Sequence, residues 1–321
     1  MMWVFKMLRI LNLAAFLLAT FAAVIQAAPP DGYYASVDLS DRFAFKRSLH
    51  NIIDDHVKVP YTSSQLDTWD VIAIADRDPL DAARVLTLYK NATYPAAAGA
   101  NEFYNREHVW PKSYGFPNDV VSNMPYTDLH HLFAADSSYN SSRSNLPFGY
   151  CSADCLEKPT DAHGGIGGNS GVYPGDSNWR QGSGAEGSWE VWLHRRGDVA
   201  RALFYMAVRY EGDLNGLTGA SEPQLELTNR IDLIEGSNTG ENISVAYMGR
   251  LDALLEWHEQ DPVDEKEMAR NDAVYAAQGN RNPFIDHPEF VAYVFTADGL
   301  GGEDDHEYAG IPIWLLYEAS K

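Results

Sequence analysis

Cysteine is nearly absent from this sequence of 321 residues, which contains only Cys151 and Cys155. Two cysteines exclude a disulfide-rich scaffold, and with one distant histidine they make no complete zinc set at a recognised spacing. Their spacing is not Cys-x-x-Cys, which disfavours a redox role. In an oxidising compartment such a pair can close a small loop, so we predict a Cys151–Cys155 disulfide.

Basic residues are also scarce. The chain has 24 Lys and Arg against 45 Asp and Glu, a formal net charge of −21. So acidic a protein has no general attraction for nucleic acid or an anionic membrane, and any polyanion that it binds must meet a local basic groove. Hydrophobic residues at 45% and charged residues at 21% exclude wholesale disorder, a collagen-like structure and an integral membrane bundle.

A long apolar run stands only near the N-terminus, over residues 10–25. Lys6 and Arg9 precede it, and the small residues Ala27 and Ala28 follow it. This layout predicts a signal peptide over residues 1–28, cleaved near Ala27 or Ala28, and therefore a secreted or periplasmic protein. An N-terminal membrane anchor is the alternative, although the run is somewhat short for a spanning helix.

The rest of the chain, residues 29–321, shows no repeat or low-complexity linker and predicts one domain of mixed α+β class. Apolar spacing favours helices over 41–57, 244–259 and 264–278, and a strand over 84–89. Glycines predict an irregular loop over 163–188. Asp198 is expected to cap a further helix, on which Arg201, Tyr205 and Arg209 form a stripe facing either solvent or a phosphate backbone.

Potentially reactive side chains are densest between residues 105 and 145: Arg106, Glu107, His108, Asp128, His130, His131, Asn140, Arg143 and Asn145. The stretch 128–136 resembles a strand, and the serines after it suit the start of a helix. A strand, loop, strand and helix in this order can bring a histidine opposite an oxygen ligand. Phosphodiester hydrolysis requires a base for water, a hard cation held by oxygen ligands and cationic donors for the phosphate.

Four blocks, NREHVWP (105–111), DLHHLFAADSSYNSSRSNLPFG (128–149), RGDVARALFYMAVRY (196–210) and GNRNPFIDHPEF (279–290), resemble the endonuclease I family of secreted and periplasmic bacterial nucleases. The resemblance implies a ββα-metal finger and hydrolysis of DNA, often also of RNA, with little sequence preference and 5′-phosphate ends. It implies His108 as general base, and Glu107 and Asn140 as ligands of Mg²⁺ or a similar ion such as Mn²⁺ or Ca²⁺. We expect a monomer whose partner is DNA or RNA.

The chain departs from this family in its cations. Many members carry an arginine between the histidine and the second strand, where residues 109–127 offer only Lys112. Arg106, Arg143 and Arg281 are then candidates for the phosphate contact, and a surface or buried ion pair is the alternative role of each arginine. Glu190 is a candidate supporting residue, as are Asp128, His130 and His131; a zinc site at the two histidines is the alternative. Residues 296–321 form a C-terminal extension with no assigned role.

Two other functions stay open at this point. A metal-dependent phosphoesterase for small extracellular phosphate esters would need similar side chains. A non-catalytic protein that binds glycans or matrix could use some of the 18 Tyr and 8 Trp for stacking on sugars, although aromatic residues more often belong to the core.

Overall fold

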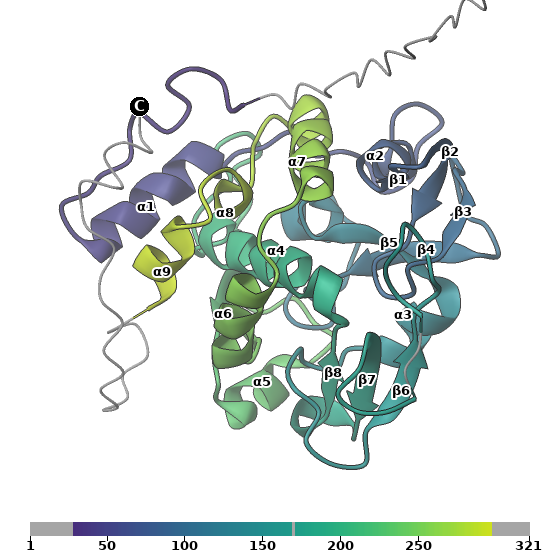
Figure 1. Ribbon diagram of the computed structural model, residues 1–321. Coiled ribbons are helices and arrows are strands. Elements are labelled where there is room, and N and C mark those ends of the chain that lie inside the picture. The colour runs from purple at the N-terminus through teal and green to yellow at the C-terminus, as the bar shows by residue number, and fades with distance from the viewer. Residues whose placement is uncertain (1–27, 169–170, 297–321) are drawn as a thin grey trace, which may run out of the picture.

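The computed structural model describes residues 28–168 and 171–296. The predicted signal peptide apart from Ala28, and the C-terminal extension apart from Thr296, lie outside the described residues. Helices and several small sheets mix in this part of the chain, so the predicted α+β class is confirmed. Figure 1 shows most of the helices gathered around α4, with strands β1 to β8 on the other side of the molecule.

The sheets are short. The order β1-β2-β3 is antiparallel, β4 pairs with β5 and the order β6-β7-β8 is also antiparallel, whereas β9 and β10 are parallel. The strands are β1 (Arg77–Asp78), β2 (Asp81–Leu86), β3 (Thr93–Pro95), β4 (Tyr104–His108), β5 (Leu132–Asp136), β6 (Leu156–Pro159), β7 (Ser177–Gln181), β8 (Ser188–Glu190), β9 (Gln224–Leu227) and β10 (Val245–Met248).

Helices form the larger part of the fold. They are α1 (Arg42–Ile53), α2 (Thr68–Ala75), α3 (Ser137–Arg143), α4 (Arg196–Arg209), α5 (Ile231–Ser237), α6 (Leu251–Gln260), α7 (Glu265–Gln278), α8 (Pro283–Asp286) and α9 (Phe290–Phe295), with the 3₁₀ turns η1 (Met124–Thr127), η2 (Gly184–Glu186) and η3 (Leu193–Arg195). The expected strand over 84–89 begins earlier and ends at Leu86, and the expected helix over 244–259 begins only at Leu251 because β10 precedes it.

Helix α4 is buried along its length and contacts α1, α6, α8 and β9. Its apolar residues Val199, Leu203 and Phe204 are fully buried, which places the helix in the core. Asp198 does not cap it: the helix begins at Arg196, and Asp198 lies in the first turn, paired with Arg195 at 2.9 Å.

The stripe of Arg201, Tyr205 and Arg209 faces neither solvent nor a groove, which corrects both expectations. All three side chains are fully buried. Arg201 donates from Nε to Glu267 at 2.8 Å, and Arg209 donates from Nη1 to Glu222 at 2.6 Å. These guanidinium groups therefore hold α4 to its neighbours, because a buried charge requires a partner.

The glycine-rich stretch 163–188 is not wholly irregular, contrary to the expectation. Its second half contains β7, which pairs with β6 and β8. Glycines limit local preference for a strand, but neighbouring strands can supply the hydrogen bonds that override it. The Cys151–Cys155 disulfide is present just before β6, as predicted.

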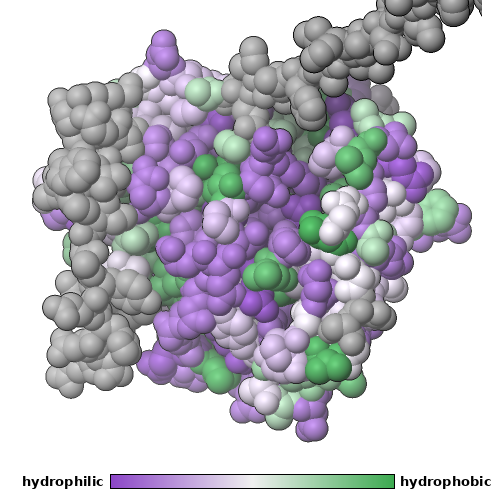
Figure 2. Space-filling view, viewed as in Figure 1, coloured by the Kyte–Doolittle hydropathy of each residue, from purple (hydrophilic) through white to green (hydrophobic). Residues whose placement is uncertain are grey.

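The surface is predominantly polar on the face shown in Figure 2, where apolar residues form small separate patches among hydrophilic ones. Scattered apolar residues of this kind are usual on a folded protein surface.

Candidate active site

Strand β4 ends at His108 and lies antiparallel to β5, with Glu107 opposite Phe133 and His108 opposite Leu132. Helix α3 follows β5 directly, and Asp136 caps it by accepting hydrogen bonds from the backbone of Ser138 and Tyr139. The expected strand over 128–136 begins at Leu132, and the cap is an aspartate rather than a serine. The strand, loop, strand and helix order brings α3 against β4: Asn140 donates from Nδ2 to the carbonyl of Arg106 at 3.3 Å.

A groove of about 330 Å³ opens over this unit. It is lined by Tyr61, Asn105, Arg106, Glu107, His108, Pro111, Lys112, Ser113, Asn140, Arg143, Ser144 and Asn145. Three of these residues are cationic and one is anionic, in a chain whose acidic residues outnumber its basic ones by 45 to 24. The groove is therefore a local exception to the charge of the whole protein.

His108 is only 8% exposed, and its Nε2 lies 2.9 Å from the carbonyl oxygen of Tyr126 in η1. A carbonyl only accepts, so Nε2 carries the proton and Nδ1 carries the lone pair of the neutral ring. No hydrogen-bond partner of Nδ1 occurs among the described residues. Burial, followed by the nearby His131, lowers the pKa of His108 well below its usual range. The ring is thus kept neutral, as a general base requires.

Glu107 is 2% exposed and shares one carboxylate oxygen between two partners. Its Oε1 accepts from the hydroxyl of Tyr89 at 2.7 Å and lies 3.1 Å from Nη1 of Arg143. Burial raises the pKa of Glu107 to about 6, against the lowering effects of Arg143 and Tyr89. The second oxygen, Oε2, has no hydrogen-bond partner in the described part of the chain.

Asn140 completes the arrangement from α3. Because its Nδ2 donates to the carbonyl of Arg106, its Oδ1 is the remaining acceptor of the side chain. Glu107, His108 and Asn140 all line the same groove. Two side chains that can offer an oxygen ligand to a metal ion, and one imidazole that can accept a proton, therefore come together there.

The three arginines named by the sequence have different surroundings. Arg143 is 1% exposed and donates to the carbonyls of His108 and Val109 at 3.1 and 2.8 Å. Arg106 lies with its guanidinium 3.3 Å from the ring centre of Tyr61 and donates to Thr68 at 2.8 Å. Arg281 does not line the groove; it is buried and paired with Asp272 and Asp286.

The candidate supporting residues lie outside the groove lining. Nε2 of His130 lies 3.0 Å from the carbonyl of Asn280, and Nε2 of His131 lies 2.7 Å from the carbonyl of Pro125. Asp128 accepts from the hydroxyls of Tyr205 and Tyr210, both at 2.9 Å. These side chains fix the loop between β4 and β5.

Glu190 lies at a different place, at the end of β8. It accepts from the backbone N–H of Cys151 at 2.8 Å and pairs with Arg196 at 2.5 Å. It therefore joins the disulfide segment to the start of α4 rather than lining the groove.

Three aromatic residues of the site were not identified from the sequence. Tyr61 lines the groove, Tyr89 binds Glu107, and the backbone of Tyr126 binds His108. Tyr61 and Tyr89 precede β4 in the sequence, and no residue spacing indicates that their segments approach the groove. The contact of Tyr126 is made by its backbone carbonyl, which every residue type has, so the sequence cannot reveal it.

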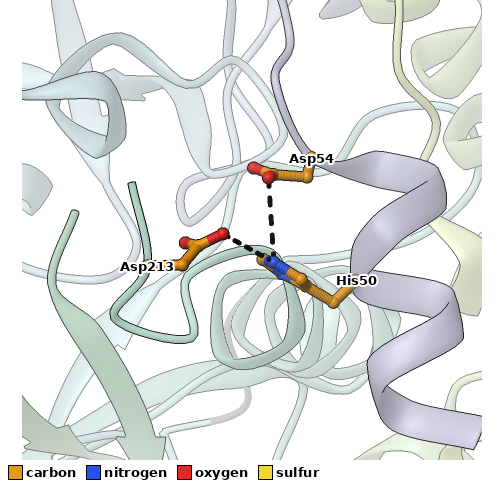
Figure 3. A group of neighbouring side chains, drawn as sticks. All are labelled: His50, Asp54 and Asp213. Carbon is orange, nitrogen blue, oxygen red and sulfur yellow. Dashed lines mark hydrogen bonds and ion pairs between the residues drawn. The ribbon is translucent and has the colours of Figure 1, made fainter. Parts of the chain in front are cut away.

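A second group of ionisable side chains, His50, Asp54 and Asp213, joins the end of α1 to the loop after α4 (Figure 3). Nδ1 of His50 lies 3.0 Å from the carbonyl of Val208, and Nε2 lies 3.1 Å from Asp213 and 3.7 Å from Asp54. Arg209 also contacts Asp54, at 2.5 Å. None of these residues lines the groove.

Among the residues that the structure describes, no helix combines the length and the apolar content needed to cross a membrane. Comparison with known proteins gives concordant matches. The family described as Endonuclease I matches residues 42–289. An extracellular ribonuclease of Bacillus amyloliquefaciens is 39% identical over 273 residues, covering 84% of this chain and 80% of the relative. An extracellular ribonuclease of Bacillus subtilis (strain 168) is 38% identical over 278 residues, covering 86% and 82%. The chain therefore belongs to the Endonuclease I family of nucleases, as its motifs predicted.

Proposed function

We propose that this protein is a secreted, metal-dependent endonuclease that hydrolyses phosphodiester bonds of DNA and RNA with little sequence preference and leaves 5′-phosphate ends. One observation carries the proposal. The buried, neutral His108, whose Nδ1 has no hydrogen-bond partner among the described residues, lines a cation-rich groove together with Glu107 and Asn140, which can offer oxygen ligands. RNA is included because the two relatives are named as ribonucleases, and DNA because the sequence motifs resemble those of DNA-cleaving nucleases. The relatives are also named as extracellular, which agrees with the predicted signal peptide.

The donor set suits a hard divalent cation. Oε2 of Glu107 and Oδ1 of Asn140 are oxygen atoms without hydrogen-bond partners in the described part of the chain, and Glu107 is the anionic one. Mg²⁺ commonly takes one or two protein oxygen ligands and completes its shell with water and substrate oxygens. Glu107 and Asn140 would therefore hold Mg²⁺ or a similar ion, and His108 needs no place among the ligands.

His108 acts as the general base in this mechanism. Its Nδ1 accepts a proton from the water that attacks phosphorus, while the Tyr126 carbonyl holds the ring through Nε2. Arg143 positions the site, because it binds the carbonyl of His108 and the carboxylate of Glu107 at once. When bound, the divalent ion supplies positive charge near the departing 3′ oxygen.

Purified protein should be incubated with plasmid, with a long RNA and with a small aryl phosphate ester, each with and without a chelator. We expect both polymers to be cleaved, the chelator to stop cleavage, and added Mg²⁺, Mn²⁺ or Ca²⁺ to identify the ion. Products should accept a label on the 5′ end only after phosphatase treatment. Cleavage that persists in the chelator would contradict the metal requirement, and hydrolysis of the small ester alone would indicate a phosphoesterase.

Asn140→Ala tests the ligand assignment. It should raise the metal concentration needed for half-maximal rate by about tenfold or more, as loss of a metal-site contact commonly does. Asn140→Asp keeps an oxygen at that position and is the matched control. An unchanged metal requirement in Asn140→Ala would remove this residue from the ligand set.

A further inference from the structure

Hydrolysis of a phosphodiester requires a cation on the non-bridging phosphate oxygens, and the groove offers Arg106, Lys112 and Arg143. Arg143 is almost completely buried and gives its donors to Glu107 and to two backbone carbonyls. Arg106 is half-buried, stacks on Tyr61 and donates to the carbonyl of Tyr61 and to Thr68. Nη1 of Arg106 and both terminal nitrogens of Arg143 thus hold the walls of the groove, and the remaining Nε of each arginine is buried.

Lys112 differs from both arginines because its side chain is exposed. It lies in the turn directly after Pro111, four positions beyond His108. The turn is anchored by buried neighbours, since Trp110, Tyr114 and Phe116 are fully buried, and the N–H of Phe116 donates to the carbonyl of Lys112 at 3.1 Å. A lysine with a fixed backbone and an exposed side chain can reach a ligand without rearranging the fold.

The position of the ammonium group links it to the base. Nζ of Lys112 donates to the hydroxyl of Tyr126 at 3.1 Å, and the carbonyl of the same Tyr126 binds His108. The rings of His108 and Tyr126 lie 5.0 Å apart. An ammonium group has three N–H donors, and the structure gives one of them a protein partner, which leaves two for a ligand.

We propose that Lys112 binds the phosphate of the substrate, contacting a non-bridging oxygen of the phosphodiester that faces His108. This inference rests on the proposed nuclease function. An ammonium group is a compact charge rather than a planar fork, so it attracts phosphate without fixing its orientation through paired hydrogen bonds. Phosphate contacts carry no information on base sequence, which suits cleavage with little sequence preference.

The test compares Lys112→Ala and Lys112→Arg with Arg47→Ala, which removes an exposed cation of α1 outside the groove. The readout is kcat/KM on a DNA duplex at several NaCl concentrations with saturating Mg²⁺. Lys112→Ala should lower kcat/KM about 10- to 100-fold at low salt, the usual contribution of a hydrogen bond to a charged group. It should also make the slope of log kcat/KM against log salt shallower by about 0.9, because one phosphate contact is lost.

Lys112→Arg should keep the wild-type salt slope, and Arg47→Ala should keep both the rate and the slope. A purely structural lysine would change the rate without changing the salt slope, so Lys112→Ala with the wild-type slope overturns the inference. Lys112→Gln, which keeps most of the side-chain length, should show the same loss as Lys112→Ala. Failure of the proposed function is a separate result, since the wild-type protein would then cleave no polymer at any salt concentration.

Discussion

Two regions of this molecule concentrate charged and polar side chains. One is the groove over β4 and α3, and the other is a network along α4 that we call the α4 network, made of Arg201, Tyr205 and Arg209 with their partners Asp128, Glu222 and Glu267. In the α4 network each side chain binds another side chain of the network within the core. In the groove, Nδ1 of His108 has no hydrogen-bond partner among the described residues, and Nζ of Lys112 binds the hydroxyl of Tyr126.

The difference teaches that reactive residue types do not mark a site by themselves. The α4 network contains more charged side chains than the groove, but its donors and acceptors are matched, and it stabilises the packing of α4. The groove is distinguished by atoms that have no partner within residues 28–168 and 171–296, such as Oε2 of Glu107. Substitutions in the two regions should therefore affect different measurements.

The largest effect is expected at the base. His108→Ala should lower kcat by roughly 10²–10⁴-fold at saturating substrate and metal, the usual contribution of a positioned base. Because the buried ring also packs against Tyr61, Tyr126 and His131, stability should fall as well, so kcat is measured on the folded fraction. Added imidazole should restore part of the rate. A near wild-type kcat, or a defect confined to metal requirement, would contradict the assignment.

A substitution in the α4 network should cost a comparable free energy, but the loss should appear in stability rather than in kcat. Arg209→Met leaves Glu222 and Asp54 without their countercharge, which should lower the free energy of unfolding by about 3–5 kcal/mol. Urea unfolding measures this loss, and the double variant Arg209→Met with Glu222→Gln should recover part of it. Since the network does not touch the groove, the specific activity of the folded fraction should stay at the wild-type level. A fall in the kcat of folded Arg209→Met would show that the α4 network and the groove are coupled.

The next largest effect is expected from acid, which should lower the free energy of unfolding through the buried histidines His56 and His130. Burial lowers the pKa of His56 to about 3 and that of His130 to about 4, from 6.5. Between pH 6.5 and about 4 the unfolded chain therefore binds protons that the folded chain excludes, so the free energy of unfolding falls as the pH falls. Each such histidine costs about 1.4 kcal/mol per pH unit, on the order of 3 kcal/mol across this window. Urea titrations at pH 7, 6 and 5 measure the slope, which should flatten in His130→Gln.

The smallest effect is expected at the disulfide. Cys151 and Cys155 are separated by four positions, and closing so short a loop contributes about 2 kcal/mol or less. Cys151→Ser with Cys155→Ser should lower Tm by a few degrees and leave the protein folded and active. Loss of folding in this variant would show that the segment around Glu190 depends on the bridge more than its loop length implies.

Helices α1 and α7 could be predicted from the sequence because the residues that begin or end them are neighbours in the chain. Asp41 and Asp264 cap α1 and α7, and Gly279 ends α7 in the left-handed conformation, close to the expected bounds. Strand β7 was missed because its hydrogen bonds come from β6 and β8, which outweigh its glycine-rich surroundings.

The residues proposed as base and metal ligands lie together, as the motifs suggested, whereas several of their neighbours were not identified from the sequence. Glu107, His108 and Asn140 belong to the motifs over 105–111 and 128–149, and they share one groove. Arg201 was misread because its partner Glu267 lies 66 positions along the chain, and residue type alone does not report burial. The same limit applies to Arg143, whose carbonyl partners become visible only in three dimensions.

The hydrogen bond between His108 and the carbonyl of Tyr126 affects how well the site tolerates mutation during evolution. Every residue type carries a backbone carbonyl, so residue 126 can change without deleting the acceptor that fixes the tautomer of His108. A mutation of Tyr126 can disturb this bond only by moving the turn η1 itself. The orientation of His108 is therefore shielded from most single mutations at its own contact, whereas a partner supplied by a side chain could be lost in one step.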